Sequence, residues 1–309
     1  EKSGKENATL IHEGEFLERW AGAGEGTARV LKQRGMEDFS LAVKALDPKP
    51  LTQGILEKMH ACMLMSGTLH PLEMYADLLG VSDEKVVKKF YASPFPKENK
   101  LNLIAPVATT KYTARSEEAF EQIAARVGKI VNNIPGNSVV FFPSFKLLDN
   151  IGSKIREYTP RVLLFQTENM KVEQTADLIK KFRQHAQGFG SVLLACANGS
   201  LAEGLDFPGN QLLGVVIVGI PLAEMNVETK ALVDYYETKF KQGWHYGYIY
   251  PAMGKAVQAA GRVIRTPTDK GVIVFLDSRY LWESYKTCLP PTQTYEVSHE
   301  PEERVKGFW

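Results

Sequence analysis

Short apolar runs alternate with helix-length segments from residue 101 to residue 289, and this alternation restricts the possible folds more than any other feature of the chain. The apolar runs predict strands at 101–107, 138–142, 162–166, 191–197, 214–220 and 271–276. The segments that follow them predict helices at 116–132, 145–158, 172–187, 226–241, 255–265 and 280–288. Strands that alternate with helices in this way form a parallel sheet covered by helices on both faces. We therefore expect an α/β fold that binds its ligands at the carboxyl ends of the strands.

The first hundred residues give weaker and more mixed patterns. They predict helices at 15–20 and 27–34, a helix at 51–61 that runs into a strand at 62–65, and a helix from residue 71. Residues 91–100 are rich in Pro and Lys, which favours a domain boundary there. We expect a small helical or strand-containing segment in front of the main sheet.

Composition limits the classes of protein to which the chain can belong. The net charge of +1 gives no overall attraction to nucleic acid, so any such site must be a local patch. The three cysteines are far apart, so we expect no disulfide framework and no metal site, with buried thiols at Cys62 and Cys196. No apolar run is long enough to span a membrane, and no signal peptide is recognisable. The chain starts without Met, and we expect it to be a piece of a longer protein.

The sequence QAAGRVIR at residues 258–265 carries the strongest functional signal. On a helix, Gln258, Arg262 and Arg265 would share one face, because positions three and four apart are neighbours. Two guanidinium groups and an amide on one edge suit phosphate oxygens, since arginine presents a fixed fork of donors. The alternative is a solvated helix face. The buried strand predicted directly afterwards, at 271–276, favours the phosphate site.

A glycine-rich loop at residues 198–209 follows a predicted strand and contains three glycines and two carboxylates. Gly204 lets the backbone approach a ligand closely. Glu203 and Asp206 could accept hydrogen bonds from a ribose, orient a water or hold nearby arginines. The alternative is that the loop is only a turn.

The turn of Ser66, Gly67 and Thr68 has a similar position, between the predicted strand at 62–65 and the helix that begins near Pro71. It leaves hydroxyl and amide groups at the carboxyl end of the strand, where ligands bind in open α/β sheets. A plain strand–turn–helix corner would look the same.

Aromatic residues near the predicted loops are candidate stacking surfaces for single-stranded nucleic acid. Trp244 and Tyr246 belong to an aromatic run at 244–250, which could instead be a strand with one face in the core. Phe145 follows the strand at 138–142 and could stack on a base or lie under the helix that it begins. Ser144 is placed to cap that helix.

Asp277 and Arg279 add a charged pair directly after the last predicted strand. A phosphate contact by Arg279 is one interpretation, and a simple helix cap is the other.

The chain contains no GxxxxGK[ST] phosphate loop and no acidic pair after a strand that would hold magnesium. It therefore offers arginines suited to a terminal phosphate but nothing to cradle a nucleotide. This asymmetry favours an ATPase whose site lies between two lobes, of which this chain supplies the second. An arginine delivered across such an interface accelerates phosphoryl transfer by roughly 10³–10⁵ in known cases.

These segments together resemble motifs III, IV, V and VI of the XPD-type superfamily 2 helicases, in that order. The matching residues are SGTLHP at 66–71, FFPSF at 141–145, AEGLDF at 202–207 and QxxGRxxR at 258–265. The resemblance runs from about residue 49 to residue 289 and is to the carboxyl-terminal half of such a helicase, with an archaeal member expected.

The resemblance implies a RecA-like second motor domain at 96–309, the last strand and helix of the first motor domain at 51–95, and the end of an arch-like region at 1–50. It implies an ATP-dependent 5′-to-3′ DNA helicase of nucleotide excision repair, with ATP and Mg²⁺ between two motor domains and single-stranded DNA across them. The first motor, the arch and a [4Fe–4S] domain would belong to the rest of the protein. Such a protein would be cytoplasmic in an archaeon and nuclear in a eukaryote.

The same resemblance assigns roles to individual residues. Arg262 and Arg265 would reach the ATP phosphates, with Gln258 in support. The residues expected to couple ATP to DNA are Ser66, Gly67, Thr68, Glu203, Gly204 and Asp206. The residues expected to contact DNA are Ser144, Phe145, Trp244, Tyr246, Asp277 and Arg279.

The chain departs from the family pattern in one main respect, because the Walker motifs and the cluster cysteines have no counterpart in it. DinG-like helicases share the matching motifs and are an alternative. A non-catalytic nucleic-acid-binding or scaffold module on the same fold is another. A small-molecule enzyme on a doubly wound sheet would need a dinucleotide fingerprint, which the sequence lacks.

Overall fold

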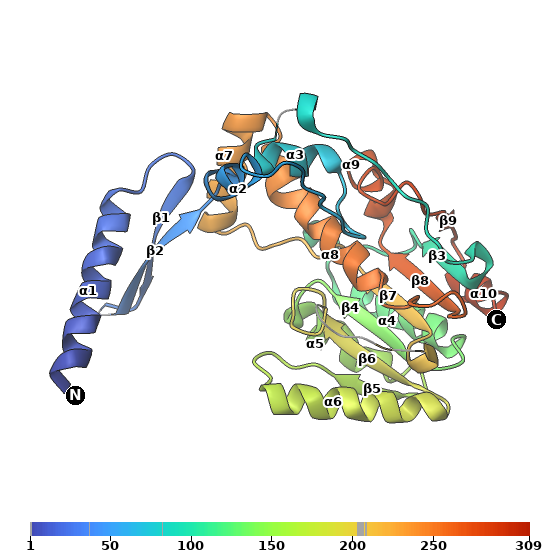
Figure 1. The fold of residues 1–309 in the computed structure, drawn as a ribbon. Helices are drawn as coiled ribbons and strands as arrows, with labels where there is room; N and C mark the ends of the chain where they lie inside the picture. Colours follow the sequence, from blue (N-terminus) through green and yellow to red (C-terminus); the bar gives the residue numbers. More distant parts are fainter. Residues whose placement is uncertain (1, 37, 82, 203–206, 208) are drawn as a thin grey trace. The chain divides into compact units, whose positions relative to one another are not determined.

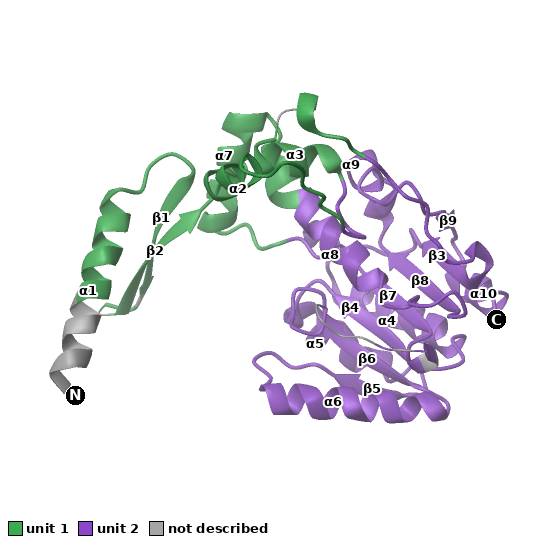
Figure 2. Ribbon diagram, viewed as in Figure 1, with its two compact units in different colours: residues 1–65, 71–88, 223–248 green, residues 66–70, 89–222, 249–309 purple. Residues whose placement is uncertain are grey.

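The computed structural model describes residues 2–36, 38–81, 83–202, 207 and 209–309. The chain forms two compact units (Figure 2). The first comprises residues 1–65, 71–88 and 223–248, and the second comprises residues 66–70, 89–222 and 249–309. Glu203, Gly204 and Asp206, which we expected to couple ATP to DNA, lie outside the described residues.

The second unit is built on a seven-stranded sheet with the strand order β5-β6-β4-β7-β8-β3-β9, in which every neighbouring pair is parallel. The strands are β3 Lys100–Ile104, β4 Ser138–Phe142, β5 Val162–Phe165, β6 Ser191–Cys196, β7 Gly214–Val218, β8 Gly271–Leu276 and β9 Glu296–Val297. The predicted parallel sheet is confirmed. Residues in β4, β6, β7 and β8 are buried along the whole strand, which is why their sequences are continuous apolar runs.

Helices cover both faces of this sheet (Figure 1). One face carries α4 Glu117–Asn132, α5 Phe145–Ile155 and α10 Pro301–Lys306, and the other carries α6 Val172–Gln184, α8 Tyr250–Ala260 and α9 Glu283–Lys286. Side chains alternate between the two cores, so that in β4 Val139 and Phe141 pack on one side while Val140 and Phe142 pack on the other. Short 3₁₀ turns lie at Lys97–Asn99, Tyr112–Ala114, His185–Gln187, Gly209–Gln211 and Ser278–Leu281.

The first unit is mostly helical and contains a two-stranded hairpin. Its elements are α1 Lys2–Ala21, β1 Thr27–Arg34, β2 Asp38–Ala45, α2 Lys49–Leu56, α3 Leu72–Leu79, a 3₁₀ turn at Asp83–Lys85 and α7 Val227–Phe240. The helix predicted at 27–34 is wrong, because this segment is strand β1 and pairs antiparallel with β2. Gly35 turns the chain between the two strands with a positive φ of 83°, which glycine adopts without strain. Val30 of β1 is buried, and the pairing with β2 outweighs the local helical pattern.

The strand predicted at 62–65 is also wrong. These residues belong to no strand in the described structure, and Met63 is 79% exposed. Cys62, which we expected to be buried, is exposed, whereas Cys196 is buried as predicted. A strand requires a neighbour to accept its backbone hydrogen bonds, and none of the described strands pairs with this run.

The strand offered as one interpretation of the aromatic run at 244–250 is wrong. Residues His245–Ile249 form a π-helical turn that leads directly into α8. The helix predicted at 255–265 begins earlier, at Tyr250, and ends at Ala260. Arg262 and Arg265 therefore lie beyond the helix, in the segment that connects it to β8.

Candidate functional site

The loops at the carboxyl ends of the central strands meet closely in the second unit. A Cβ atom on Gly219, which follows β7, would overlap Thr110 in the loop after β3 and approach Pro143, which follows β4. The side-chain amide of Asn198, after β6, donates to the Pro143 carbonyl oxygen at 2.9 Å. Parallel topology brings these loops together, and it creates the edge at which such folds bind ligands.

The arginine-bearing segment is a turn anchored by apolar residues. Val263 and Ile264 are buried in the core, whereas Arg265 and Gln258 are exposed. Arg262 is half-buried, and its Nη2 donates to the carbonyl oxygen of Ala202 at 3.0 Å. The expected shared helix face of Gln258, Arg262 and Arg265 is wrong, because the helix ends two residues before Arg262.

Hydrogen bonds between described residues attach the glycine-rich loop to α8 and to the arginine turn. Besides the bond from Arg262 to Ala202, Lys255 Nζ on α8 donates to Asn198 Oδ1 at 2.8 Å. Leu201, Ala202 and Phe207 are buried in the core on either side of the undescribed residues. Sequence reasoning missed Asn198 and Lys255, although a polar residue directly after a buried strand was a usable signal.

The turn of Ser66, Gly67 and Thr68 belongs to the second unit. The backbone N–H of Thr68 donates to Ser66 Oγ at 3.2 Å, and the two hydroxyl oxygens are 3.2 Å apart. His70 Nε2 lies 2.9 Å from the carbonyl oxygen of Thr287, which attaches this turn to the end of α9. Whether the turn couples two motor domains stays a prediction.

Ser144 caps α5, as predicted from the sequence. Its hydroxyl oxygen accepts a hydrogen bond from the backbone N–H of Leu147 at 3.3 Å. Phe145 is half-buried at the first position of the helix. Its ring therefore keeps some exposed surface at the carboxyl edge, and a stacking role remains a prediction.

Asp277 and Arg279 form a buried ion pair at the same edge. Asp277 is fully buried and Arg279 is 7% exposed. Arg279 donates from Nε to Oδ1 and from Nη2 to Oδ2 of Asp277, each at 2.8 Å, and Nη2 also donates to Thr110 Oγ1 at 2.9 Å. Burial alone would lower the pKa of Arg279, but the bonds to Asp277 raise it above its usual value.

The carboxylate of Asp277 also accepts from the backbone N–H of Arg279 and from that of Thr110, so it caps the following 3₁₀ turn. This geometry favours the helix-cap interpretation over a DNA contact by either residue.

Trp244 and Tyr246 have different surroundings within the first unit. Trp244 is 49% exposed, and its ring centroid lies 4.6 Å from that of Tyr248. Tyr246 is 7% exposed, packs against Tyr236 and Phe240, and donates its hydroxyl to Asp77 Oδ2 at 2.6 Å. Trp244 therefore keeps the surface that stacking requires, whereas Tyr246 belongs to the core of its unit.

Two exposed pairs of a cation and an aromatic ring at the carboxyl edge were missed by the sequence reasoning. Lys111 Nζ lies 5.6 Å from the Trp282 ring centroid, and the Arg115 guanidinium lies 5.4 Å from that of Tyr112. Arg115 Nε also donates to the carbonyl oxygen of Thr110 at 3.0 Å, which holds this pair beside the ion pair. Basic and aromatic groups after a predicted strand were the available signal.

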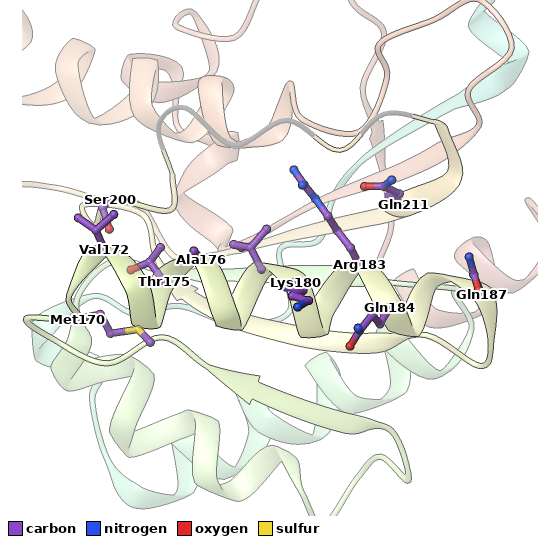
Figure 3. A pocket seen from close by; sticks show the side chains of 11 residues that line it. Met170, Val172, Thr175, Ala176, Lys180, Arg183, Gln184, Gln187, Ser200 and Gln211 are labelled. Atoms are coloured by element: carbon purple, nitrogen blue, oxygen red, sulfur yellow. The ribbon is translucent and has the colours of Figure 1, made fainter.

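A hollow of about 740 Å³ lies beside α6 (Figure 3). Thr175, Ile179 and Arg183 of the helix line it, together with Ser200 of the glycine-rich loop and Gln211 of the 3₁₀ turn that follows the loop. None of Gln258, Arg262 and Arg265 lines this hollow, so it is separate from the arginine turn. Within the described residues, no cluster of three or more metal-ligating side chains occurs, and no helix is long and apolar enough to cross a membrane.

The fold is the RecA-like fold of a second helicase motor domain. Residues 127–293 match the family described as the helicase C-terminal domain, and the chain belongs to this family. The solved structures that it resembles include an apo form of XPD, with a TM-score of 0.66 at 22% identity over 96% of this chain and 59% of that one. A second XPD helicase structure gives a TM-score of 0.61 at 24% identity over 84% of this chain and 47% of that one.

Curated relatives agree with this assignment. The Saccharomyces cerevisiae general transcription and DNA repair factor IIH helicase subunit XPD/RAD3 is 25% identical over 76% of this chain and 32% of its own length. The Caenorhabditis elegans ATP-dependent DNA helicase chl-1 is 22% identical over 84% of this chain and 33% of its own length. The chain is thus similar to the carboxyl-terminal part of XPD-type superfamily 2 helicases, and it spans about a third of the length of these relatives.

Proposed function

We propose that this chain is the second-motor half of an ATP-dependent 5′-to-3′ DNA helicase that acts in nucleotide excision repair. The observation that carries the proposal is the arginine turn, in which Arg262 is bonded to the glycine-rich loop and Arg265 remains exposed. An ATP-driven motor needs cations at the transferring phosphate and a connection from that site to the strand it moves. In this proposal the arginine turn would supply the cations, and its contact with the loop would supply the connection.

Arg262 and Arg265 would stabilise the negative charge that develops on the terminal phosphate of ATP, with Gln258 in support. The turn supplies donors but no phosphate cradle, because the sequence has no GxxxxGK[ST] loop. The cradle and the Mg²⁺ ligands would come from the first motor domain, so that ATP lies between the two motors. Arginine contacts of this kind act on the transition state and contribute roughly 10³–10⁵ in rate.

Single-stranded DNA would bind at the carboxyl edge of the sheet. Phe145, Tyr112 and Trp282 offer ring surface there, while Lys111 and Arg115 offer positive charge for the backbone. Stacking on aromatic rings and attraction to phosphates are the two contributions that bind a single strand without sequence preference. Ser144, Asp277 and Arg279 would hold the loops of this edge in place. In the first unit, Trp244 would be a separate stacking surface for DNA.

The loop that begins at Asn198 would couple the two ligands. Lys255 on α8 and Arg262 in the arginine turn donate hydrogen bonds to this loop. Asn198 in turn donates a hydrogen bond to the carbonyl oxygen of Pro143, which precedes Ser144 and Phe145. Glu203, Gly204 and Asp206 would complete the loop, and Ser66, Gly67 and Thr68 would transmit the state of one motor to the other.

The remaining parts of the helicase would pair with surfaces that this chain leaves exposed. We assign residues 1–50 to the end of an arch-like region, 51–95 to the first motor and 96–309 to the second. A [4Fe–4S] cluster takes four cysteine thiolates, and this chain has only three cysteines, two of them buried. Any such cluster would therefore lie in another part of the protein. The protein would be located in the cytoplasm of an archaeon or in the nucleus of a eukaryote.

ATP hydrolysis tests the proposal directly. The chain by itself should hydrolyse no ATP, with or without single-stranded DNA. In the protein that combines it with a first motor domain, Arg262→Ala should abolish turnover and leave DNA affinity nearly unchanged. Normal turnover by Arg262→Ala would refute the catalytic role and favour a non-enzymatic binding or scaffold module.

A further inference from the structure

The segment that carries the two arginines has no helix to orient it. Residues 261–270 connect α8 to β8, and Arg265 lies in an exposed part of this connection. Catalysis by arginine depends on placing its donors accurately, and a misplacement of about 1 Å can cost roughly 10²-fold in rate. Some other part of the structure must therefore hold the backbone at Arg265.

Apolar packing fixes the first half of the turn. Val263 is 1% exposed and Ile264 is also buried, and both belong to the core beneath α8. Gly271 lies directly against Val263, because a Cβ atom there would overlap the Val263 side chain and would lie 3.1 Å from the carbonyl oxygen of Leu213. This anchor ends at Ile264, and residues 265–268 are exposed.

The carboxylate of Asp269 holds the second half. Its Oδ2 accepts hydrogen bonds from the backbone N–H of Arg265 at 2.7 Å and from that of Thr266 at 2.8 Å, and its Oδ1 accepts from the Thr266 hydroxyl at 2.7 Å. Asp269 is 4% exposed. Burial alone would raise its pKa, but these three hydrogen bonds lower it below the usual value, so the group stays ionised at neutral pH.

We propose that Asp269 is a positioning residue for phosphoryl transfer, because its carboxylate fixes the backbone at Arg265 and so directs that side chain toward the ATP phosphates. This inference rests on the proposed function. Asp269 itself touches no ligand in this scheme. It acts through the backbone of Arg265, to which it is bonded directly, while Ile264 in the core fixes the other side of the same residue.

A purely structural role for Asp269 predicts a different result. A buried carboxylate with three hydrogen bonds also stabilises the fold, so its removal lowers stability in either case. A structural role lowers the amount of folded enzyme and leaves the rate per folded molecule unchanged. A positioning role lowers the rate constant of the folded enzyme, and it does so only while Arg265 is present to be positioned.

The test uses the protein that combines this chain with the first motor domain. Asp269→Ala removes all three hydrogen bonds, and Asp269→Asn keeps a neutral acceptor. The matched control is Thr159→Ala. Like Asp269, Thr159 is a buried residue whose side-chain oxygen accepts a hydrogen bond from a nearby backbone N–H, in this case that of Arg161 at 3.2 Å. The residue lies before β5, apart from the arginine turn. DNA-stimulated ATP turnover is measured per folded molecule, with kcat and KM separated, in the wild-type and Arg265→Lys backgrounds.

We expect Asp269→Ala to lower kcat by roughly tenfold to a hundredfold with KM for ATP within about twofold, since the arginines act mainly on the transition state. Asp269→Asn should retain more activity than Asp269→Ala, and Thr159→Ala should keep the wild-type kcat. In the Arg265→Lys background, Asp269→Ala should lower kcat by less than about threefold, because residues that act as a unit are not additive.

Two outcomes would overturn the inference while leaving the proposed function intact. One is that folded Asp269→Ala keeps the wild-type kcat although Arg265→Lys has a lowered kcat. The other is that Asp269→Ala lowers kcat by the same factor in the wild-type and in the Arg265→Lys backgrounds. If Arg262→Ala and Arg265→Lys both turn over ATP normally, the proposed function itself fails, and the role assigned to Asp269 fails with it.

Discussion

Replacing Arg279 by Met should lower the free energy of unfolding of the protein without changing the affinity of the folded protein for DNA. The substitution keeps most of the side-chain volume and removes the charge. It leaves the fully buried carboxylate of Asp277 without its two 2.8 Å ion-pair bonds and removes the bond to Thr110 Oγ1. Breaking one side of a buried ion pair costs about 3–5 kcal/mol. Asp277 keeps the backbone N–H donors of Thr110 and residue 279, so we expect a loss near the lower end, about 3 kcal/mol.

Urea unfolding measures this loss as a shift in the free energy of unfolding at constant m. The control is the double variant Asp277→Asn/Arg279→Met, in which no charge is buried without a partner and about 1–2 kcal/mol should be recovered. Single-stranded DNA affinity, corrected for the folded fraction, should stay within about twofold of wild type. A variant with wild-type stability and weakened DNA binding would refute the structural interpretation and make Arg279 a DNA contact.

Two other predictions concern the carboxyl edge and a buried lysine. The double variant Lys111→Ala/Trp282→Ala should weaken single-stranded DNA binding by roughly 1–3 kcal/mol in a fluorescence titration. The control Phe189→Ala, which removes an exposed ring before β6, should leave the affinity unchanged. Equal effects of the two variants would show that DNA does not bind at the carboxyl edge. Burial lowers the pKa of Lys100 from 10.5 to about 8, so the folded state binds fewer protons than the unfolded state between these values and stability rises with pH there. Lys100→Met should therefore be more stable than wild type at pH 7 by at most about 3 kcal/mol. Unfolding curves recorded up to pH 10 should show this difference in the free energy of unfolding becoming smaller. A difference that does not change with pH would contradict the lowered pKa of Lys100.

The main sheet could be predicted because its central strands are buried on both faces. The runs at 138–142 and 271–276 match β4 and β8 residue for residue. Alternating helices of ordinary length then leave few possible architectures, and the two-sided parallel sheet follows. The N-cap at Ser144 was equally predictable, since it depends on neighbours in the sequence.

The geometry of the site could be predicted only in part. The segment from Gly261 to Arg265 has a helical pattern, yet the local bonds to Asp269 and the packing of Val263 against Gly271 hold it as a turn. A helical pattern and a turn closed by a nearby carboxylate compete for the same residues, and the sequence does not decide between them. The pairing of Lys111 with Trp282 joins the loop after β3 to the loop after β8, two segments far apart in the sequence, so it exists only once the sheet has formed.

The apolar run at residues 62–65 is the case in which sequence and structure disagree most, and the disagreement leads to a test. Its composition favours a buried strand, yet Met63 and Met65 are exposed and no described strand pairs with it. If the run is an edge strand of the first motor domain, its partner lies in that domain. The Cys62 thiol should then react quickly with a maleimide in this chain alone and at least about tenfold more slowly in the complete protein. Cys196 and Cys288 serve as internal controls, because both are buried and burial raises the pKa of Cys288 to about 12, which keeps them slow in both proteins. Equal reactivity of Cys62 in the two proteins would show that this run does not become a strand of the first motor.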